Sequence, residues 1–319
     1  MQLNYIILAH QQPQNLLRLV ERLNTSKVFF FIHIDKSKDI APFERLLNRF
    51  PNVHFFNETE RQYGSWGGFG IVKASITALR TIIDRFPNDL GRCILLSGQD
   101  YPLATNQKIK SFFESNVNTE YITSYPMPFP GWKNGGMDRL RTYQFYFSKE
   151  RGDFICLPSI WEKSLYTKQN IKGIYRLAKQ NKIKNLYKLL KKRRFPNNLL
   201  PYGGSQWWNL TITTIKKILI FLENNPSYIK YHKDTLLGDE IFFQSILQYL
   251  HIKDTSIDLK RSVTYTNWER KDVPLPVTFE KKDFEELKEA SKNHLFARKF
   301  DFKKSKYLLN LIDKHLLKD

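Results

Sequence analysis

Val28-Phe-Phe-Phe-Ile-His-Ile34 is a near-continuous apolar run of about the length of one β-strand. Tyr5–Ala9 and Arg92–Leu96 are runs of the same kind, and the stretches between them carry apolar residues at helical spacing. Strands that are apolar on both faces and alternate with helices are typical of a mostly parallel sheet covered by helices on both sides. The sequence therefore predicts an α/β fold with such a sheet at its centre.

Polar residues follow several of these predicted strands. His10, Asp35 and Asp100 each lie within a few residues of a strand's carboxyl end. In sheets of this kind ligands bind beyond the carboxyl ends, so we expect the three side chains to line one site and contact a donor substrate. The residue two positions after Asp100 is Pro102 rather than a second acid. For that reason the sequence predicts no bound metal ion, and it gives no sign of another cofactor.

Basic residues outnumber acidic ones, with 51 Lys and Arg against 31 Asp and Glu and a formal net charge of +20. Such an excess implies an anionic partner, which would be a phosphate-bearing ligand, an acidic lipid surface or nucleic acid. The chain has 2 cysteines, and its N-terminus lacks the basic segment and long apolar run of a signal peptide. We therefore expect a cytoplasmic protein, either soluble or lying on the inner face of the cytoplasmic membrane.

Two later stretches carry residue types that suit sugar chemistry. Pro201-Tyr-Gly-Gly-Ser-Gln-Trp-Trp208 combines glycines, which permit close approach of a ligand, with Trp207 and Trp208, whose flat faces stack on sugar rings. In Leu237-Gly-Asp-Glu240 two carboxylates stand where a helix should begin. They either cap that helix, as its dipole favours, or one of them is a general base that faces a sugar on the tryptophan platform.

Several motifs, in this order and spacing, resemble those of one enzyme family. They are Tyr5-Ile-Ile-Leu-Ala-His10, Phe31-Ile-His-Ile-Asp35, Ser97-Gly-Gln-Asp-Tyr-Pro-Leu103, Tyr202-Gly-Gly-Ser-Gln-Trp207, Asp239-Glu240 and Asn293-His-Leu-Phe-Ala-Arg-Lys-Phe-Asp301. Over nearly its whole length the chain resembles the core-2/I-branching family of β-1,6-N-acetylglucosaminyltransferases, which also includes protein xylosyltransferases. The resemblance implies a GT-A-like fold and an inverting, metal-independent transfer of a sugar from a UDP-sugar to a hydroxyl group of a glycan acceptor.

The same resemblance implies roles for single residues on the donor side. His10 and Asp35 would contact the uridine. Lys299 would contact the diphosphate together with a second cation, which is either Arg270 or Arg298. Fixed cations of this kind would stabilise the departing UDP in place of a metal ion.

On the acceptor side the resemblance makes Glu240 the base that deprotonates the acceptor hydroxyl. Arg139 and Arg141 either grip an acidic or phosphorylated acceptor or are ordinary surface arginines, while Trp207 and Trp208 would hold the sugars. We expect GlcNAc rather than xylose to be transferred, by a bacterial relative that works in surface-polysaccharide or lipooligosaccharide assembly. The alternative is a non-catalytic carbohydrate- or membrane-binding protein that retains the fold.

We expect one glycosyltransferase domain over residues 1–319, with a nucleotide-sugar-binding half (1–125), an acceptor and catalytic half (126–319) and a basic helical insertion (161–194). The insertion has twelve Lys or Arg against the single acid Glu162, and it ends in Lys191-Lys-Arg-Arg194. It is either a solvated insertion packed on the core or an amphipathic segment on an anionic membrane, where it would meet a lipid-linked acceptor. Nucleic acid is not expected, because no aromatic stacking platform is interleaved with these cations.

Overall fold

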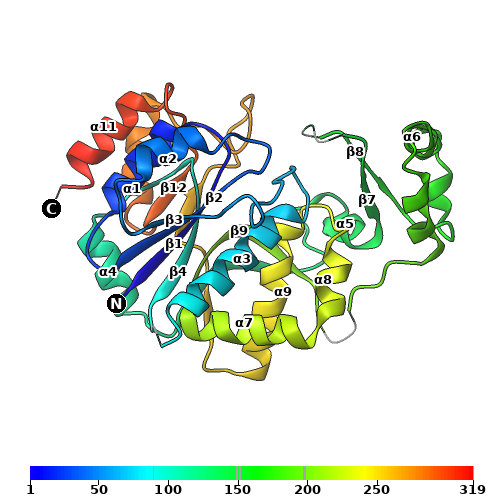
Figure 1. The fold of residues 1–319 in the computed structure, drawn as a ribbon, viewed down its shortest axis with the longest axis horizontal. Helices are drawn as coiled ribbons and strands as arrows, with labels where there is room; N and C mark the ends of the chain where they lie inside the picture. Colours follow the sequence, from blue (N-terminus) through cyan, green and yellow to red (C-terminus); the bar gives the residue numbers. More distant parts are fainter. Residues whose placement is uncertain (89, 149, 151, 197–198, 319) are drawn as a thin grey trace.

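The structure of the chain is a computed structural model that describes residues 1–88, 90–148, 150, 152–196 and 199–318 (Figure 1). The strands are β1 (Leu3–Ala9), β2 (Val28–Ile34), β3 (Val53–Phe55), β4 (Arg92–Ser97), β5 (Asp100–Pro102), β6 (Thr119–Pro126), β7 (Tyr143–Tyr146), β8 (Phe154–Leu157), β9 (Tyr202–Thr211), β10 (Asp258–Lys260), β11 (Thr264–Thr266) and β12 (Phe296–Arg298). The α-helices are α1 (Pro13–Leu23), α2 (Ala41–Leu47), α3 (Gly70–Arg85), α4 (Asn106–Glu114), α5 (Met137–Arg141), α6 (Lys168–Lys179), α7 (Ile212–Asn224), α8 (Pro226–His232), α9 (Phe242–Lys253), α10 (Phe284–Ala290) and α11 (Lys306–His315).

A seven-stranded sheet in the order β10-β6-β9-β4-β1-β2-β3 forms the centre of the molecule (Figure 1). Within it β1 runs parallel to β2 and β4, β2 parallel to β3, and β10 parallel to β6, whereas β9 is antiparallel to both of its neighbours. Helices α1, α2 and α11 pack on one face and α3, α7 and α9 on the other. The predicted α/β fold with a mostly parallel, helix-covered sheet is confirmed.

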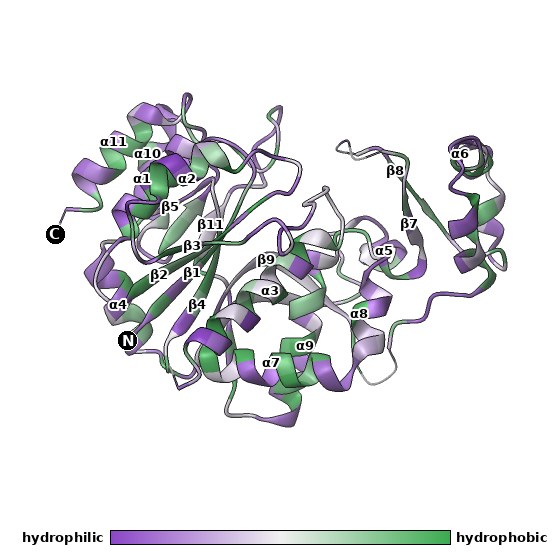
Figure 2. Ribbon diagram, viewed as in Figure 1, coloured by the Kyte–Doolittle hydropathy of each residue, from purple (hydrophilic) through white to green (hydrophobic). Residues whose placement is uncertain are grey.

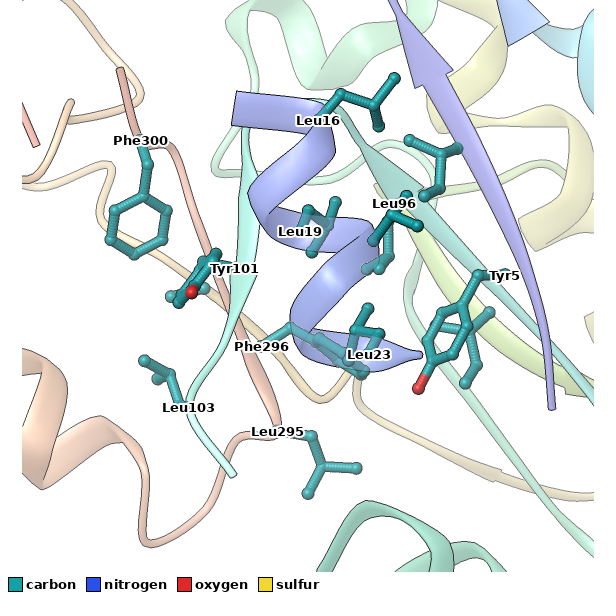
Figure 3. Packing of buried hydrophobic residues seen from close by; sticks show 14 of the residues in the cluster. Tyr5, Leu16, Leu19, Leu23, Leu96, Tyr101, Leu103, Leu295, Phe296 and Phe300 are labelled. Carbon is teal, nitrogen blue, oxygen red and sulfur yellow. The ribbon is translucent and has the colours of Figure 1, made fainter. Parts of the chain in front are cut away.

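The buried side of α1 shows how apolar spacing produces this architecture. Leu16, Leu19 and Leu23, at positions that fall on one face of a helix, are each 0% exposed. Figure 3 shows these leucines pointing toward Tyr5 and Leu96 of the sheet. Full burial of each leucine stabilises the fold by about 1.5–3 kcal/mol, so the helix is held to the sheet mainly by this stripe.

The stretch whose glycines were expected to permit close approach of a ligand is strand β9, which lies between β4 and β6. A Cβ atom on Gly204 would lie 1.9 Å from the carbonyl oxygen of Thr123, on the neighbouring strand. The glycine is therefore required by the close approach of two strands. The pairing of β9 with β6 is irregular between Ile122 and Ser124, and Trp207 and Trp208 both belong to the buried cluster on the α7 and α9 side of the sheet.

The basic insertion packs on the hairpin of β7 and β8 (Figure 1). Helix α6 is flanked by the 3₁₀ helices Lys163–Tyr166 and Ile183–Leu190, and the buried residues that these elements share with the hairpin are Phe145, Phe147, Leu157, Leu165, Leu177 and Leu189. This cluster is separate from the two that cover the central sheet. The two halves predicted on either side of residue 125 share one sheet, since β1 to β4 and β9 and β10 all belong to it.

Arg193 belongs to Lys191–Arg194, the basic run at the end of the insertion. Unlike the surface cation that such a run predicts, its side chain is buried. Arg193 is 8% exposed. Its guanidinium donates hydrogen bonds to the carbonyl oxygen of Tyr231 at 2.8 Å and to the hydroxyl of Thr235 at 2.7 Å, and further bonds reach the carbonyls of Arg139 and Thr142. Arg193 therefore anchors the end of the insertion to the body of the protein.

Replacing Arg193 by alanine should destabilise the protein by more than about 3 kcal/mol, because each lost hydrogen bond to a charged group contributes about 1.5–3 kcal/mol. The neighbouring Arg194 is exposed, so the matched variant Arg194→Ala should change the stability by no more than about 0.5 kcal/mol. Urea unfolding followed by circular dichroism measures both. Equal midpoints for the two variants would show that Arg193 does not anchor the insertion.

Candidate functional site

A cleft of 1550 Å³ opens beyond the carboxyl ends of β1, β2 and β4. Pockets for one small ligand measure roughly 300–1,000 Å³, so this cleft has room for two ligands at once. The predicted site residues that line it are His10, Asp35, Arg139, Trp207, Glu240, Arg298 and Lys299. The predicted site residues outside its lining are Asp100, Arg141, Trp208 and Arg270.

Asp35 lies at the end of β2 in a fixed hydrogen-bonded position. Its Oδ1 accepts hydrogen bonds from the backbone N–H and hydroxyl of Ser37, and its Oδ2 accepts one from the backbone N–H of Gly64 at 2.7 Å. Burial opposes ionisation of Asp35, but these hydrogen bonds outweigh it and hold the pKa below its ordinary value. A carboxylate fixed in this way can accept hydrogen bonds from a polar ligand such as a nucleoside.

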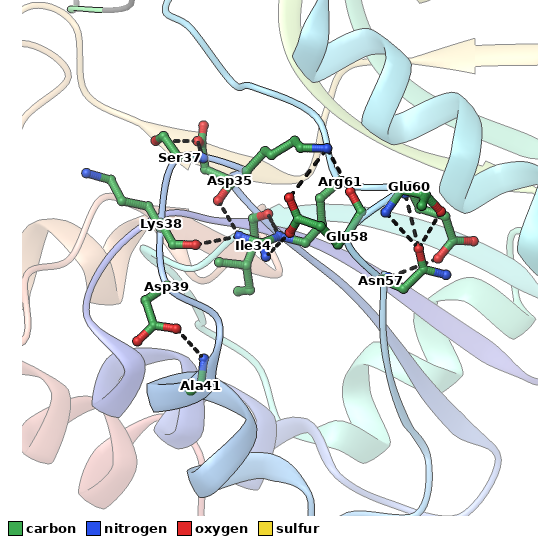
Figure 4. A network of polar contacts seen from close by, with 12 residues as sticks. Ile34, Asp35, Ser37, Lys38, Asp39, Ala41, Asn57, Glu58, Glu60 and Arg61 are labelled. Atoms are coloured by element: carbon green, nitrogen blue, oxygen red, sulfur yellow. Dashed lines mark hydrogen bonds and ion pairs between the residues drawn. The ribbon is translucent and has the colours of Figure 1, made fainter.

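Arg61 supports the segment that carries Asp35. It is buried, and it donates hydrogen bonds to the carbonyl oxygens of Ile34 at 3.0 Å and Asp35 at 2.9 Å while pairing with Glu58 at 2.9 Å (Figure 4). Nearby, Nε2 of His33 accepts a hydrogen bond from the backbone N–H of Gln62, and burial lowers the pKa of His33 to about 4. His33 is therefore neutral at neutral pH.

Arg298 is held from two sides. Its Nη1 lies 3.7 Å from Oδ1 of Asp100, and its guanidinium carbon lies 4.0 Å from the centre of the Trp207 ring. Asp100 is 1% exposed and accepts hydrogen bonds from the backbone N–H and the hydroxyl of Ser97. The prediction that Asp100 contacts the donor is therefore wrong. Its carboxylate is buried outside the cleft lining, where it positions Arg298.

The two tryptophans do not form the predicted platform. Trp208 is 0% exposed and packs against Phe243 in the cluster beneath α7 and α9, so it cannot stack on a sugar. Trp207 lines the cleft, but it is 8% exposed and its ring carries the Arg298 guanidinium. Trp207 therefore supports a cation rather than a sugar.

Aromatic residues missed by the sequence analysis line the cleft instead. Trp268 is 57% exposed and Trp66 is 42% exposed, and both belong to its lining. Trp132 also lines the cleft, with the guanidinium carbon of Arg139 at 4.0 Å from its ring centre. Exposed rings at the edge of a cleft are suited to stacking on sugars.

Lys299 follows Arg298 at the end of β12, and both line the cleft. The Lys299 backbone is fixed by hydrogen bonds with Val277 and Phe279. Arg270 was the other candidate for the second phosphate contact, but its guanidinium lies 2.6 Å from Glu286 and 2.9 Å from Asp283. Because these carboxylates occupy Arg270 outside the cleft, Arg298 is the cation that the structure brings next to Lys299.

Glu240 and Arg139 form an ion pair within the cleft. The Nη1 atom of Arg139 lies 2.6 Å from Oε2 of Glu240. Burial raises the pKa of Glu240, and the Arg139 charge opposes that rise by favouring the carboxylate. The expected acceptor contact of Arg139 is therefore replaced, in this structure, by a contact with the candidate base. Arg141, at the end of α5, is exposed and does not line the cleft.

Asp239 is a second carboxylate that the sequence analysis left as an alternative to Glu240. It lines the cleft at 7% exposure, and its Oδ1 has no hydrogen-bond partner among the described residues. Burial, followed by the Glu240 charge, raises the pKa of Asp239 to about 7. Neither carboxylate caps a helix through its side chain, since no such bond occurs at the 3₁₀ helix Gly238–Glu240 or at the start of α9.

Two further features of the described residues bear on ligand classes. No set of three or more His, Cys, Asp or Glu side chains in the described ranges is arranged as a candidate metal site. In the same ranges, no helix combines the length and apolar character that crossing a membrane requires. Cys93 is buried and Cys156 is half-buried, and neither is part of a disulfide bond.

Comparison with known proteins identifies relatives of the chain. A family model described as "Branch: Core-2/I-Branching enzyme" matches residues 3–291. The chain is similar to Homo sapiens xylosyltransferase 2, with 24% identity over 330 residues that cover 98% of this chain and 33% of that protein. It is also similar to Rattus norvegicus xylosyltransferase 1, with 21% identity over 332 residues that cover 98% of this chain and 35% of that protein. The chain thus spans about a third of the length of these relatives.

Among solved structures, the chain is similar to that of mouse xyloside xylosyltransferase 1 in its apo form. The two are 11% identical, the match covers 92% of this chain and 97% of that one, and the TM-score is 0.39.

Proposed function

We propose that this chain, which belongs to the Core-2/I-branching enzyme family, is a glycosyltransferase that moves a sugar from a UDP-sugar to a hydroxyl group of a glycan acceptor. The observation that carries the proposal is the composition of one cleft. A carboxylate, Glu240, and two adjacent cations, Arg298 and Lys299, line the same space as the strand-end residues His10 and Asp35. Base, phosphate-binding charges and a nucleoside-binding edge are the parts that this reaction needs.

The donor would lie along the carboxyl ends of the parallel strands, where ligands of such sheets bind. His10 and Asp35 would contact the uridine, with the Asp35 carboxylate already fixed by Ser37 and Gly64. Arg298 and Lys299 would contact the diphosphate. Because Asp100 and Trp207 hold the Arg298 guanidinium, and hydrogen bonds fix the Lys299 backbone, these cations can stabilise the negative charge that develops on UDP with little reorganisation.

The chemical step would use Glu240 as general base. The acceptor hydroxyl gives its proton to the Glu240 carboxylate, and its oxygen forms a bond to the anomeric carbon. The bond between that carbon and the diphosphate oxygen breaks on the opposite face, so the configuration inverts and UDP takes the electron pair. The ion pair with Arg139 engages Oε2 of Glu240, which supports Oε1 as the atom that receives the proton.

We also propose that the transfer needs no metal ion or other cofactor. The support is the pair Arg298 and Lys299, whose charges can replace those of a divalent cation beside the diphosphate. Pro102, two residues after Asp100, leaves that strand end without a second acid. Asp100 itself is engaged by Ser97 and Arg298.

GlcNAc is the proposed sugar, with xylose as the first alternative because the similar proteins named above are xylosyltransferases. The proposed acceptor is a glycan, lipid-linked where the enzyme works in bacterial surface-polysaccharide or lipooligosaccharide assembly. In that setting the protein is cytoplasmic and peripheral on the inner face of the cytoplasmic membrane. The competing candidate, a carbohydrate-binding protein without activity, is favoured only by the exposed aromatic rings of the cleft, such as Trp268.

A screen of UDP-sugars, measured as UDP release in the presence of EDTA, tests the proposal. We expect one UDP-sugar to be hydrolysed slowly without acceptor and faster with a glycan acceptor, and we expect UDP-GlcNAc to exceed UDP-xylose. GDP- and CMP-sugars serve as controls and should release no nucleotide. Activity that disappears in EDTA and returns with Mn²⁺ would refute the metal-free mechanism. Binding of UDP-sugars without any turnover would favour the non-catalytic alternative.

A further inference from the structure

The basic insertion exposes an unusual number of large apolar side chains for a surface that carries so many cations. Those at least half exposed between residues 161 and 190 are Trp161, Tyr166, Ile171, Tyr175, Ile183, Tyr187 and Leu190. They lie on and around α6, at the end of the molecule opposite the N-terminus of the chain (Figure 1). Figure 2 shows hydrophobic and hydrophilic residues alternating along these helices.

Helix α6 separates its apolar residues into two opposite faces. Gly173 and Leu177 are buried against the hairpin, and a Cβ atom on Gly173 would lie 2.2 Å from Ile155. With about 100° between successive residues, Ile171 and Tyr175 lie roughly opposite to that buried face. They are 55% and 70% exposed. One apolar face of α6 thus packs on the hairpin, and a second apolar face remains in solvent.

Cations surround this second face. Lys168, Lys172 and Lys179 fall within about 100° of Ile171 on the helical wheel and are all exposed. The indole N–H of Trp161, which precedes the 3₁₀ helix Lys163–Tyr166, donates a hydrogen bond at 2.9 Å to the carbonyl of Leu190, the last residue of the 3₁₀ helix Ile183–Leu190. This bond joins two residues with exposed apolar side chains next to the exposed Lys191. We call the exposed residues of 161–194 the basic apolar face.

We propose that the basic apolar face docks on a bilayer that contains acidic phospholipids. Tryptophan and tyrosine favour the boundary between headgroups and acyl chains, where the ring is in an apolar layer and its polar atom in water. Lysine side chains reach from such a position to the phosphates. A helix with an apolar stripe flanked by lysines binds membranes in this way by lying in the interfacial plane.

The chemistry of the face favours a bilayer over other anionic partners. Nucleic acid would use the cations but would leave isoleucine and leucine side chains in water without a role. A second copy of the chain would bring the exposed cations of this face against those of the other copy, and like charges repel. An acidic lipid surface satisfies both the charge and the apolar side chains.

Docking would also orient the cleft. Arg193, at the end of the insertion, donates a hydrogen bond to the carbonyl of Arg139, whose side chain pairs with Glu240. The membrane-facing segment is therefore joined directly to the acceptor side of the cleft. This part of the inference rests on the proposed function, and it predicts that the acceptor is lipid-linked.

Sedimentation with vesicles tests the docking without any activity measurement. The wild type should bind phosphatidylcholine vesicles that contain about one third phosphatidylglycerol, and bind pure phosphatidylcholine far less. The triple variant of Lys168, Lys172 and Lys179 to Gln should bind about 100-fold more weakly, which corresponds to about 1 kcal/mol for each cation. The double variant Ile171→Gln, Tyr175→Gln should also bind vesicles more weakly. Its remaining binding depends on charge alone, so among these proteins only this variant should lose all vesicle binding in molar salt, where charge attraction is screened.

Matched controls lie at the opposite end of the molecule. The exposed residues Lys281, Lys282 and Lys314 provide a triple Gln variant that removes the same charge as the α6 lysine variant. Tyr307, which is 71% exposed, provides a Gln variant that removes an aromatic ring like that of Tyr175. These controls should bind vesicles like the wild type, and all variants should keep the same circular dichroism and UDP binding. Absence of wild-type binding, or an equal loss in the controls, would overturn the proposal. Binding to duplex DNA but not to vesicles, or a dimer lost in the Ile171 variant, would assign the face to those partners instead.

The lipid-linked acceptor has a separate readout. If docking serves catalysis, the triple lysine variant should transfer sugar to a soluble acceptor at the wild-type rate and to a vesicle-bound acceptor at least about 10-fold more slowly, in keeping with its weaker binding. Equal rates on both acceptors in a variant that no longer binds vesicles would refute the link to the acceptor. Failure of transfer by all proteins would count against the proposed function and leave the docking result intact.

Discussion

Replacing Glu240 by glutamine should lower the rate of sugar transfer by about 10²- to 10⁴-fold, the range that a positioned general base contributes. The amide keeps the shape of the side chain and can still bond Arg139, but it cannot take a proton. Because Glu240 would not contact the nucleotide, the affinity for UDP should change little. Steady-state transfer assays and calorimetric titration with UDP measure the two quantities.

Two further variants make this result specific. Glu269 also lines the cleft and is exposed, so Glu269→Gln removes the same charge from the same space and should leave the rate within a few-fold of wild type. Asp239→Asn tests the neighbouring carboxylate, whose pKa burial raises to about 7, close to the working pH that suits a general base. Near wild-type transfer by Glu240→Gln together with loss in Asp239→Asn would move the base to Asp239.

The fold was predictable because its determinants are local. Val28–Ile34 is apolar on both faces and forms β2 at the predicted bounds, and the apolar spacing of 13–23 gives α1. Each of these patterns is a property of a few consecutive residues. The exception is β9, where paired glycines and tryptophans were interpreted as a ligand-binding stretch. The pairing of a strand with neighbours far away in sequence is not contained in its own residues.

The site was predictable to the extent that topology fixes positions. His10 and Asp35 line the cleft because the ends of parallel strands meet at one edge of the sheet. What could not be predicted is which charges pair with one another. Arg270 finds Asp283 and Glu286, Arg139 finds Glu240, and Arg193 finds backbone carbonyls. The three-dimensional packing decides which partner each charged side chain meets. The role of one Lys or Arg therefore cannot be inferred from how many basic residues surround it in the sequence.

Replacing Lys299 by alanine should lower turnover by about 10²- to 10³-fold, the loss seen when one preorganised charge or donor is removed from a developing anion. Lys299 is the better position to change than Arg298. The Arg298 side chain covers Trp207 and pairs with the enclosed Asp100, so its removal would leave a buried carboxylate without its partner and destabilise the fold. Turnover of the Lys299 variant is measured with saturating donor, and its folding is checked by thermal unfolding.

The charge of Lys299 can be separated from the general basicity of this segment. Lys303 is exposed, lies four positions further along the chain and is outside the cleft lining, so Lys303→Ala loses the same charge without losing a phosphate contact. Its turnover should match that of the wild type. Added Mg²⁺ or Mn²⁺ should not restore the Lys299 variant, because Asp100, which lies opposite Arg298 in strand β5, is already engaged by Ser97 and Arg298. Restoration by either ion would mean that a metal can occupy the diphosphate site, and equal losses in the two lysine variants would mean that Lys299 acts only through the overall charge of the cleft.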